Sequence, residues 1–238
     1  QGHGSYILNC SNNFITVGPH AEHVIVFAIT SEEDGKKRHT ALIVKRDMDG
    51  YQVAPHDEKM GIKAAHSSTI FFENTKVPKE YVLGEDGQGF KIAMNTLDGG
   101  RIGIAAQALG IARAALDKAI AYAKERHAFG RPIANFQAIQ WMLADSDVEL
   151  DAARLLTLRA AGLKDRGARH SAESAMAKLY ASEMSTRVTH RALQVHGGYG
   201  YTTEYGMDRH YRDARITEIY EGTSEIQRLV IAKTALSR

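Results

Sequence analysis

The first 83 residues alternate between short runs rich in β-branched and aromatic residues and short stretches of turn-forming residues. The apolar runs occupy residues 6–8, 14–17, 23–29, 41–44 and 68–72. Turns are expected at Asn12-Asn13, Asp34-Gly35, Asp49-Gly50 and residues 59–61. Because no helical period interrupts these runs, the pattern predicts a largely antiparallel sheet, folded as a small barrel or sandwich.

From Phe90 onward the apolar positions follow a helical period. Leu97, Ile104 and Ile111 recur at seven-residue steps. Alanines occupy neighbouring positions, which predicts one long helix packed closely on others. Further helices are predicted over residues 136–164 and 171–195, with a short piece at 204–212 and a closing helix from Ser224.

Long helices joined by short loops are typical of a bundle. The punctuation by Pro78 and by glycines at residues 84–89 marks the boundary between the two patterns. The sequence therefore predicts an α+β multidomain protein. An antiparallel β-barrel or sandwich domain over residues 1–85 would be followed by a four-helix bundle domain over residues 86–238.

Composition narrows the class of protein. No apolar run approaches the roughly 18 residues that a membrane helix needs, so no membrane span is expected. The net charge of +2 comes from scattered residues, which argues against a nucleic-acid partner. The single cysteine, Cys10, excludes an intramolecular disulfide and indicates a reducing compartment; it is predicted to be a small packed residue. The sequence begins at Gln1 with no signal or transit pattern, so we expect it to be the later part of a longer polypeptide.

Common nucleotide and metal motifs are not found. The glycine-rich stretches at residues 84–89 and 197–200 lack the strand–loop–helix context of a dinucleotide fingerprint, and the second is expected to end a helix. The eleven histidines show no metal-ligand spacing. Neither a Rossmann site nor a metal site is therefore predicted.

Three positions combine charge with glycine or aromatic neighbours, and each has a structural and a functional interpretation. Asp98 and Arg101 lie three apart on one helix face, as an ion pair or as the edge of a ligand groove. The glycines between and after them, at 99, 100 and 103, each weaken a helix by roughly 1 kcal/mol, so close backbone approach or a ligand is expected there.

Arg126 follows the first long helix, where the helix dipole alone favours a basic residue. The functional alternative is a bidentate phosphate contact, with Phe129 against a ring. Glu221 precedes the closing helix, for which Thr223 or Ser224 is the predicted N-cap and Glu225 suits the first turn. It is either an ordinary turn carboxylate or a catalytic base.

Seven stretches in order resemble the acyl-CoA dehydrogenase family, most closely its short-chain or butyryl-CoA members. They are FIT at 14–16, NTKVP at 74–78, LDGGRIGIAAQALGIA at 97–112, ERHAFGRPI at 125–133, FQAIQ at 136–140, QVHGGYGY at 194–201 and RDARITEIYEGTSEIQR at 212–228. The family has an N-terminal helical domain, a middle β domain and a C-terminal four-helix bundle. The resemblance implies that this chain comprises most of the second domain and all of the third.

The resemblance also implies roles for individual residues. Glu221 matches the catalytic base. FAD lies in the family between the β domain and the bundle, with contacts from a neighbouring subunit. The matching cofactor residues are Phe14, Thr16, Arg126, Gln137, Gln194, Val195, His196, Gly197, Gly198, Thr223, Ser224 and Glu225. Of these, Arg126, Gln137 and residues 194–198 would contact the FAD of the partner subunit. The matching acyl-CoA contacts are Asp98, Gly99, Gly100, Arg101 and Gly222.

The reaction that the resemblance implies is FAD-dependent α,β-dehydrogenation of a short-chain acyl-CoA thioester to the trans-2-enoyl-CoA. Glu221 would remove the pro-R α-proton while the β-hydrogen leaves as hydride to flavin N5. The backbone N–H of Glu221 and a flavin ribityl hydroxyl would stabilise the enolate-like charge. Electrons would pass to an electron-transferring flavoprotein. A homo-oligomer, dimer or tetramer, is expected, in a bacterial cytoplasm or the mitochondrial matrix.

Two alternatives stay open. The family usually has a Gly-x-Lys segment where this chain has Cys10, Ser11 and Asn12, and an Asn where Val17 stands. A non-catalytic helical oligomerisation module that keeps the fold without the cofactor is therefore one alternative. An acyl-CoA oxidase relative is the other.

Overall fold

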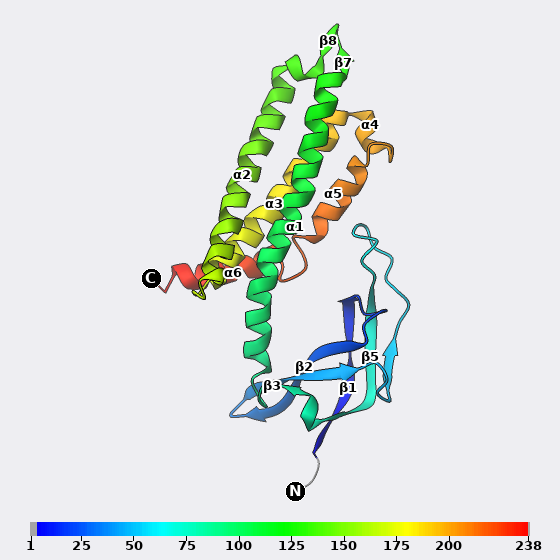
Figure 1. Cartoon of the computed structure of the whole chain (residues 1–238), viewed down its shortest axis with the longest axis vertical. Coiled ribbons are helices and arrows are strands. Elements are labelled where there is room, and N and C mark those ends of the chain that lie inside the picture. Colours follow the sequence, from blue (N-terminus) through cyan, green and yellow to red (C-terminus); the bar gives the residue numbers. More distant parts are fainter. Residues whose placement is uncertain (1–3, 238) are drawn as a thin grey trace. The chain divides into compact units, whose positions relative to one another are not determined.

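A computed structural model describes residues 4–237, apart from the side chain of Glu33 (Figure 1). The chain divides into two compact units. The first, here called the β unit, contains the described residues up to Lys59 and Lys63–Thr96. The second, the helical unit, contains Met60–Ile62 and the residues from Leu97 onward.

Two antiparallel three-stranded sheets build the β unit. One has the strand order β1 (Ser5–Thr16), β5 (Ser67–Pro78), β4 (Tyr51–Val53), and the other β2 (His23–Glu33), β3 (Lys36–Lys45), β6 (Val82–Leu83). A 3₁₀ turn at Lys79–Tyr81 separates β5 from β6. Buried residues of both sheets, among them Leu42, Ile70 and Phe72, form one apolar core. The predicted barrel is wrong, because the sheets do not close on each other. The edge strands β4 and β6, of three and two residues, are too short to join them.

Strand β1 differs from the prediction. Residues 6–8 and 14–17 were expected to be separate strands around a turn at Asn12-Asn13, but one strand runs from Ser5 to Thr16 along β5. The irregularity appears instead as a register shift between Asn12 and Ile15, with Phe14 at a φ of 59°. A β-bulge thus accommodates the residues that favour a turn.

Cys10 was predicted to be packed, and it is exposed. Leu8, two residues earlier, is buried in the core. Strict alternation would place both side chains on one face of the sheet, but the ladder shifts register between them. Residues 9–14 are all exposed, so both faces of this part of β1 lie outside the core, and Cys10 is exposed with its neighbours.

Gly50 lies so close to the backbone of β5 that a side chain would not fit at this position. Its φ is 80°, and a Cβ there would lie 2.0 Å from the carbonyl oxygen of Glu73. We expect Gly50→Ala to lower the free energy of unfolding of the β unit by about 3 kcal/mol, because strain and a backbone clash combine. Hydrogen exchange of the β5 amides measures this loss. Gly35→Ala is the control, since its φ is 71° with no atom within 4 Å, and should cost only about 1 kcal/mol. Equal costs at both positions would contradict the clash.

The helical unit is dominated by three long helices. They are α1 (Gly89–Glu125), whose first turns belong to the β unit, α2 (Gln137–Asp165) and α3 (Ser171–His196). Shorter helices follow as α4 (Gly198–Tyr201), α5 (Met207–Ile216) and α6 (Ser224–Ala235). A two-stranded ribbon, β7 (His127–Ala128) and β8 (Arg131–Pro132), and a 3₁₀ turn (Ile133–Asn135) connect α1 to α2. The helices predicted from residues 90, 136 and 171 are confirmed to within a residue at their starts.

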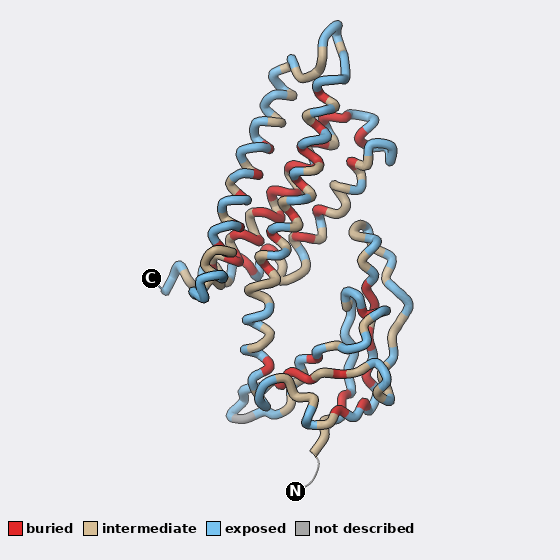
Figure 2. Tube along the Cα trace, in the orientation of Figure 1, coloured by how far each residue is buried: buried red, intermediate tan, exposed pale blue. Residues whose placement is uncertain are grey.

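Alanines allow the long helices to approach closely. The core contains Ala105, Ala108 and Ala112 of α1, with further buried alanines of α2 and α3. Buried positions run along α1 and α3 in Figure 2. Helix α3 packs against α2, α5 and α6. Within residues 4–237, no helix combines the length and the apolar character needed to cross a bilayer.

Candidate active site

The segment between α5 and α6 carries Glu221, and both of its ends are held by hydrogen bonds. The Ser224 N–H donates to the Glu218 carbonyl at 3.0 Å. Thr223 is the N-cap of α6, where its hydroxyl oxygen accepts from the Ile226 N–H. Of the two predicted caps, Thr223 therefore has the role, and Ser224 is the buried first residue of the helix.

Glu221 and Gly222 both have left-handed backbone conformations, with φ of 55° and 91°. This conformation costs a residue with a Cβ about 1–2 kcal/mol, so tertiary contacts must maintain it. Gln227 Nε2 donates to the carbonyls of Glu221 at 3.2 Å and Gly222 at 2.8 Å. Lys178 Nζ also donates to the Gly222 carbonyl, at 2.7 Å.

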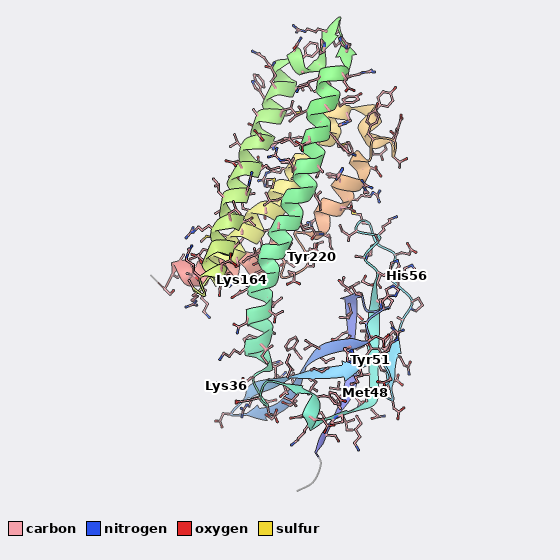
Figure 3. The ribbon with its side chains drawn as sticks, in the orientation of Figure 1. Lys36, Met48, Tyr51, His56, Lys164 and Tyr220 are labelled. Atoms are coloured by element: carbon pink, nitrogen blue, oxygen red, sulfur yellow. The ribbon has the colours of Figure 1, made fainter. Side chains whose placement is uncertain are left out.

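The Glu221 carboxylate is half-buried and lies against α1. A Cβ built on Gly100 would lie 2.5 Å from Glu221 Oε2. Tyr220, labelled in Figure 3, donates its hydroxyl to Gln107, which lies about two turns beyond Gly100 on α1. Among residues 4–237, no group donates a hydrogen bond to the Glu221 carboxylate. The carboxylate is therefore available to accept a proton from outside the chain.

Asp98 and Arg101 form the expected ion pair, with 2.8 Å between Asp98 Oδ1 and Arg101 Nη1. Both side chains are largely buried, at 18% and 6% exposed. Asp98 Oδ2 accepts from the Ser171 hydroxyl at the start of α3. Arg101 Nε is buried without a hydrogen-bond partner among the described residues. The pair thus fixes α1 to α3 and leaves one donor unused.

The glycines beside this pair behave differently from one another. Lys164 Nζ, at the end of α2 in Figure 3, would lie 3.0 Å from a Cβ on Gly99. Gly100 faces the Glu221 carboxylate. Gly103 has no atom within 4 Å of a Cβ position, so the expected close approach is absent there. The missing side chains at 99 and 100 make room for charged groups next to α1.

A cavity of about 680 Å³ lies at the other end of α1. Its lining includes the predicted cofactor residues Arg126, Val195, His196, Gly197 and Gly198, with the aromatic residues Tyr122, Phe129, Phe136 and Tyr199. Figure 1 shows the connection between α1 and α2 at this end, close to α4. The Arg126 guanidinium carbon lies 5.7 Å from the Tyr199 ring centroid.

His196 is buried in the wall of this cavity and stacks on Tyr122, with 4.4 Å between ring centroids. Burial lowers the pKa of His196, and the positive charge of Lys118 lowers it further. The hydrogen bond to the Ala192 carbonyl acts in the opposite direction and raises the pKa. His196 Nδ1 lies 2.7 Å from the Ala192 carbonyl, so in the neutral ring Nδ1 carries the proton. The other ring nitrogen, Nε2, is then an acceptor.

The predicted cofactor residues of the helical unit fall into two separate groups. Gly100, beside Glu221, and Tyr122, in the cavity wall, are 22 residues apart on α1. At 1.5 Å per residue this separation is about 33 Å. One planar ring therefore cannot contact both groups of a single chain.

Seven predicted cofactor residues lie outside the cavity lining. Gln137 and Gln194 are exposed at the first turn of α2 and near the end of α3. Phe14 and Thr16 are exposed on β1 of the β unit. Glu225 is exposed in the first turn of α6, beside Thr223 and Ser224.

Two residues that support the Glu221 turn were not predicted from the sequence. Lys178 and Gln227 are both fully buried. Lys178 occupies a face of α3 whose other buried members are small, among them Ser174, Ala175, Ala181, Ser182 and Ser185. A lysine among small residues at helical spacing is the signal that would have identified it.

Two family profiles match most of this chain. Residues 1–75 match the profile for "Acyl-CoA dehydrogenase, middle domain", and residues 87–236 match that for "Acyl-CoA dehydrogenase, C-terminal domain". Short-chain specific acyl-CoA dehydrogenase, mitochondrial, of Rattus norvegicus is 53% identical over 228 residues, which cover 96% of this chain and 55% of that protein.

Solved structures with the same fold are also found. Butyryl-CoA dehydrogenase from Megasphaera elsdenii superposes with a TM-score of 0.96 at 47% identity, covering 99% of this chain and 62% of that one. Acyl-CoA dehydrogenase complexed with FAD from Bacillus anthracis has a TM-score of 0.90 at 34% identity, covering 98% of this chain and 42% of that one. This chain therefore spans only part of the length of these relatives, 55% of the rat protein and 62% and 42% of the two solved chains. It belongs to the acyl-CoA dehydrogenase family.

Proposed function

We propose that this protein catalyses FAD-dependent α,β-dehydrogenation of a short-chain acyl-CoA thioester to the trans-2-enoyl-CoA, with Glu221 as the base. The observation that carries the proposal is the position of the Glu221 carboxylate. It is half-buried against Gly100 and receives no hydrogen bond from residues 4–237. Identity of 53% to a short-chain acyl-CoA dehydrogenase supports the choice of substrate class.

The chemistry requires a base and donors for the developing negative charge. The α-proton of a thioester is too weakly acidic for an unaided carboxylate, so hydrogen bonds to the thioester oxygen must stabilise the enolate-like charge. The backbone N–H of Glu221 donates to no acceptor among residues 4–237 and is the proposed donor. FAD, when bound, accepts the β-hydrogen as hydride.

The cavity at the far end of α1 suits a dinucleotide. It offers aromatic side chains for a planar ring, glycine backbone at 197 and 198 for close approach, and Arg126 for a phosphate. Because it lies about 33 Å along α1 from Gly100, we propose that it holds the FAD bound beside Glu221 of a second copy of the chain. Gln137 and Gln194 would contact the same FAD, and residues 223–225 would hold the cofactor of their own chain. Phe14 and Thr16 stay a prediction of the resemblance.

The remaining roles follow from the same proposal. The proposed acyl-CoA contacts are Asp98, Gly99, Gly100, Arg101 and Gly222, and the unpartnered Arg101 Nε is the donor that this role would use. A homo-oligomer is required, since two copies complete each cofactor site. An electron-transferring flavoprotein is the proposed acceptor of the electrons.

The visible spectrum of the purified protein tests the function. The protein is expected to take up FAD, and butyryl-CoA is expected to bleach the flavin band without oxygen while the enoyl-CoA forms. A series of longer acyl-CoAs then gives the chain-length preference. A colourless protein that does not take up FAD would favour a non-catalytic oligomerisation module. Stoichiometric oxygen uptake during turnover would favour an oxidase.

Arg126→Met is expected to raise the FAD dissociation constant by about 10- to 100-fold, because a charge-assisted hydrogen bond to phosphate contributes about 1.5–3 kcal/mol. Equilibrium dialysis against FAD measures the change. Lys124→Met is the matched control, since Lys124 is exposed in the last turn of the same helix. If both variants weaken FAD binding equally, Arg126 serves the helix dipole and not a phosphate.

A further inference from the structure

Helix α3 presents a buried lysine to the segment that carries the proposed base. Lys178 has no exposed surface, and its ammonium donates to the Gly222 carbonyl at 2.7 Å. A buried lysine requires strong compensation, because removing an ammonium from water is costly. Among the described residues, the Lys178 ammonium has one hydrogen-bond acceptor, the Gly222 carbonyl.

Helix α6 presents a second buried donor to the same place. Gln227 is fully buried, and its Nε2 donates to the carbonyls of Glu221 and Gly222 at 3.2 and 2.8 Å. The Gly222 carbonyl thus accepts from two helices at once. A Cβ on Gly222 would lie 2.7 Å from Gln227 Nε2, so the turn and the amide are closely packed.

These hydrogen bonds fix the orientation of the two peptide groups that follow Glu221 and Gly222. Carbonyl and N–H point in opposite directions across a trans peptide, and the chain contains no cis peptide among its described residues. The N–H groups of Gly222 and Thr223 therefore point away from the two buried donors. With both carbonyls held, the left-handed φ angles of Glu221 and Gly222 are maintained.

We propose that Lys178 and Gln227 are positioning residues, which hold the Glu221–Gly222 turn by its two carbonyls and so direct the Glu221 carboxylate toward Gly100. For catalysis the inference rests on the proposed function. For the conformation of the turn it does not, because the hydrogen bonds belong to the chain itself.

Protonation of Lys178 gives the proposal a pH dependence. The pKa of Lys178 is lowered to about 8. Burial is the main cause and the charge of Arg101 on α1 contributes, while the carboxylates of Glu218, Glu221 and Glu225 act in the opposite direction. Below that pH the charged ammonium is a strong donor to the Gly222 carbonyl. Above it the neutral amine is a weaker donor, so the turn is expected to loosen as the pH rises through about 8.

Global stability should respond in the opposite direction. The unfolded chain keeps its lysine proton up to the ordinary pKa of 10.5, whereas the folded chain releases it at about 8. Between these values the unfolded state binds more protons, so this group's contribution to folding stability rises with pH. A loss of order confined to the turn is therefore distinguishable from global unfolding.

Hydrogen exchange measured by mass spectrometry tests the conformational part without FAD. The reporters are the Tyr220 and Ser224 amides, which donate to backbone carbonyls, and a peptide from the middle of α3 corrects for the intrinsic effect of pH. In the wild type, protection of the turn is expected to fall as the pH passes the Lys178 pKa. Lys178→Met and Gln227→Leu should each lower this protection by about tenfold, and Lys178→Met should remove its pH dependence.

Lys233→Met is the control, since Lys233 is exposed on α6. Melting temperatures verify that each variant folds, and the wild-type pH series remains decisive if one does not. Unchanged protection of the turn in the variants, or across the pH series, would overturn the proposal.

The FAD-loaded protein tests the catalytic part. Lys178→Met is expected to slow flavin reduction by butyryl-CoA by about 10- to 100-fold, because the Glu221 carboxylate would be displaced from the reacting position. The acyl-CoA dissociation constant should change little. The wild-type rate is expected to decline above pH 8, and this decline should be absent from Lys178→Met. If the turn loosens and the rate is unchanged, the positioning role is wrong. If the wild type does not reduce flavin at all, the proposed function fails while hydrogen exchange still decides the conformational role.

Discussion

Replacement of Glu221 by glutamine is expected to slow the reduction of bound flavin by butyryl-CoA by about 10⁴-fold. Glutamine matches glutamate in shape but cannot accept the α-proton as a carboxylate does. The side chain receives no hydrogen bond from residues 4–237, so its replacement leaves no internal donor unpaired. FAD content and acyl-CoA affinity should therefore be retained. Stopped-flow absorbance of the flavin band measures the rate, and dialysis measures the affinity.

Glu204→Gln provides the control for this experiment. Glu204 is exposed between α4 and α5, in the same unit of the chain. Its replacement should leave flavin reduction within twofold of the wild-type rate, as surface substitutions usually do. A Glu221→Gln protein that reduces flavin as fast as the Glu204→Gln protein would remove Glu221 from the mechanism.

Gly100→Ala should slow flavin reduction by about 10²-fold while the protein stays folded. The added Cβ would lie 2.5 Å from Glu221 Oε2, so the carboxylate must move aside. The obstructing atoms are the end of a flexible side chain, which can rotate without disturbing the backbone. Alanine also favours a helix over glycine by about 1 kcal/mol, so the melting temperature should not fall.

Gly103→Ala separates the effect on the carboxylate from the effect on the helix. Gly103 lies one turn further along α1, with no atom within 4 Å of a Cβ position. Its replacement should raise the free energy of unfolding by about 1 kcal/mol and leave flavin reduction unchanged. If the two variants reduce flavin at the same rate, contact with Gly100 does not determine the position of the base.

The predictions from sequence succeeded where a local pattern decides the structure. The seven-residue period of Leu97, Ile104 and Ile111 placed α1, although these three side chains are only partly buried and the core positions are the alanines beside them. The cap at Thr223 was one of two candidates, both adjacent to the first helical turn. The ion pair between Asp98 and Arg101 followed from their spacing of three residues.

The same reasoning failed where distant segments decide. Asn12 and Asn13 favour a turn locally, but pairing with β5 keeps them in a strand that bulges at Phe14. The exposure of Cys10 likewise depends on which part of β1 the core covers, and the core reaches Leu8 but not residues 9–14. Neither is visible in a window of the sequence around β1.

The site required still longer-range information. Lys178 precedes Gly222 by 44 residues, and the two residues meet only because α3 packs beside the Glu221–Gly222 turn. Gly100 and Glu221 are likewise brought together by the packing of α1 on the segment after α5. The motifs indicated which residues matter, whereas the direction from which each is held is a property of the folded chain.

Exchange of the substrate α-hydrogens tests the central claim most directly, that Glu221 removes the α-proton. The FAD-loaded protein is incubated with butyryl-CoA in D₂O, and deuterium at C2 of the recovered thioester is measured by mass spectrometry. The wild type is expected to incorporate deuterium, and Glu221→Gln to do so more slowly by about 10³-fold or more. Incorporation by Glu221→Gln at the wild-type rate would show that another group is the base.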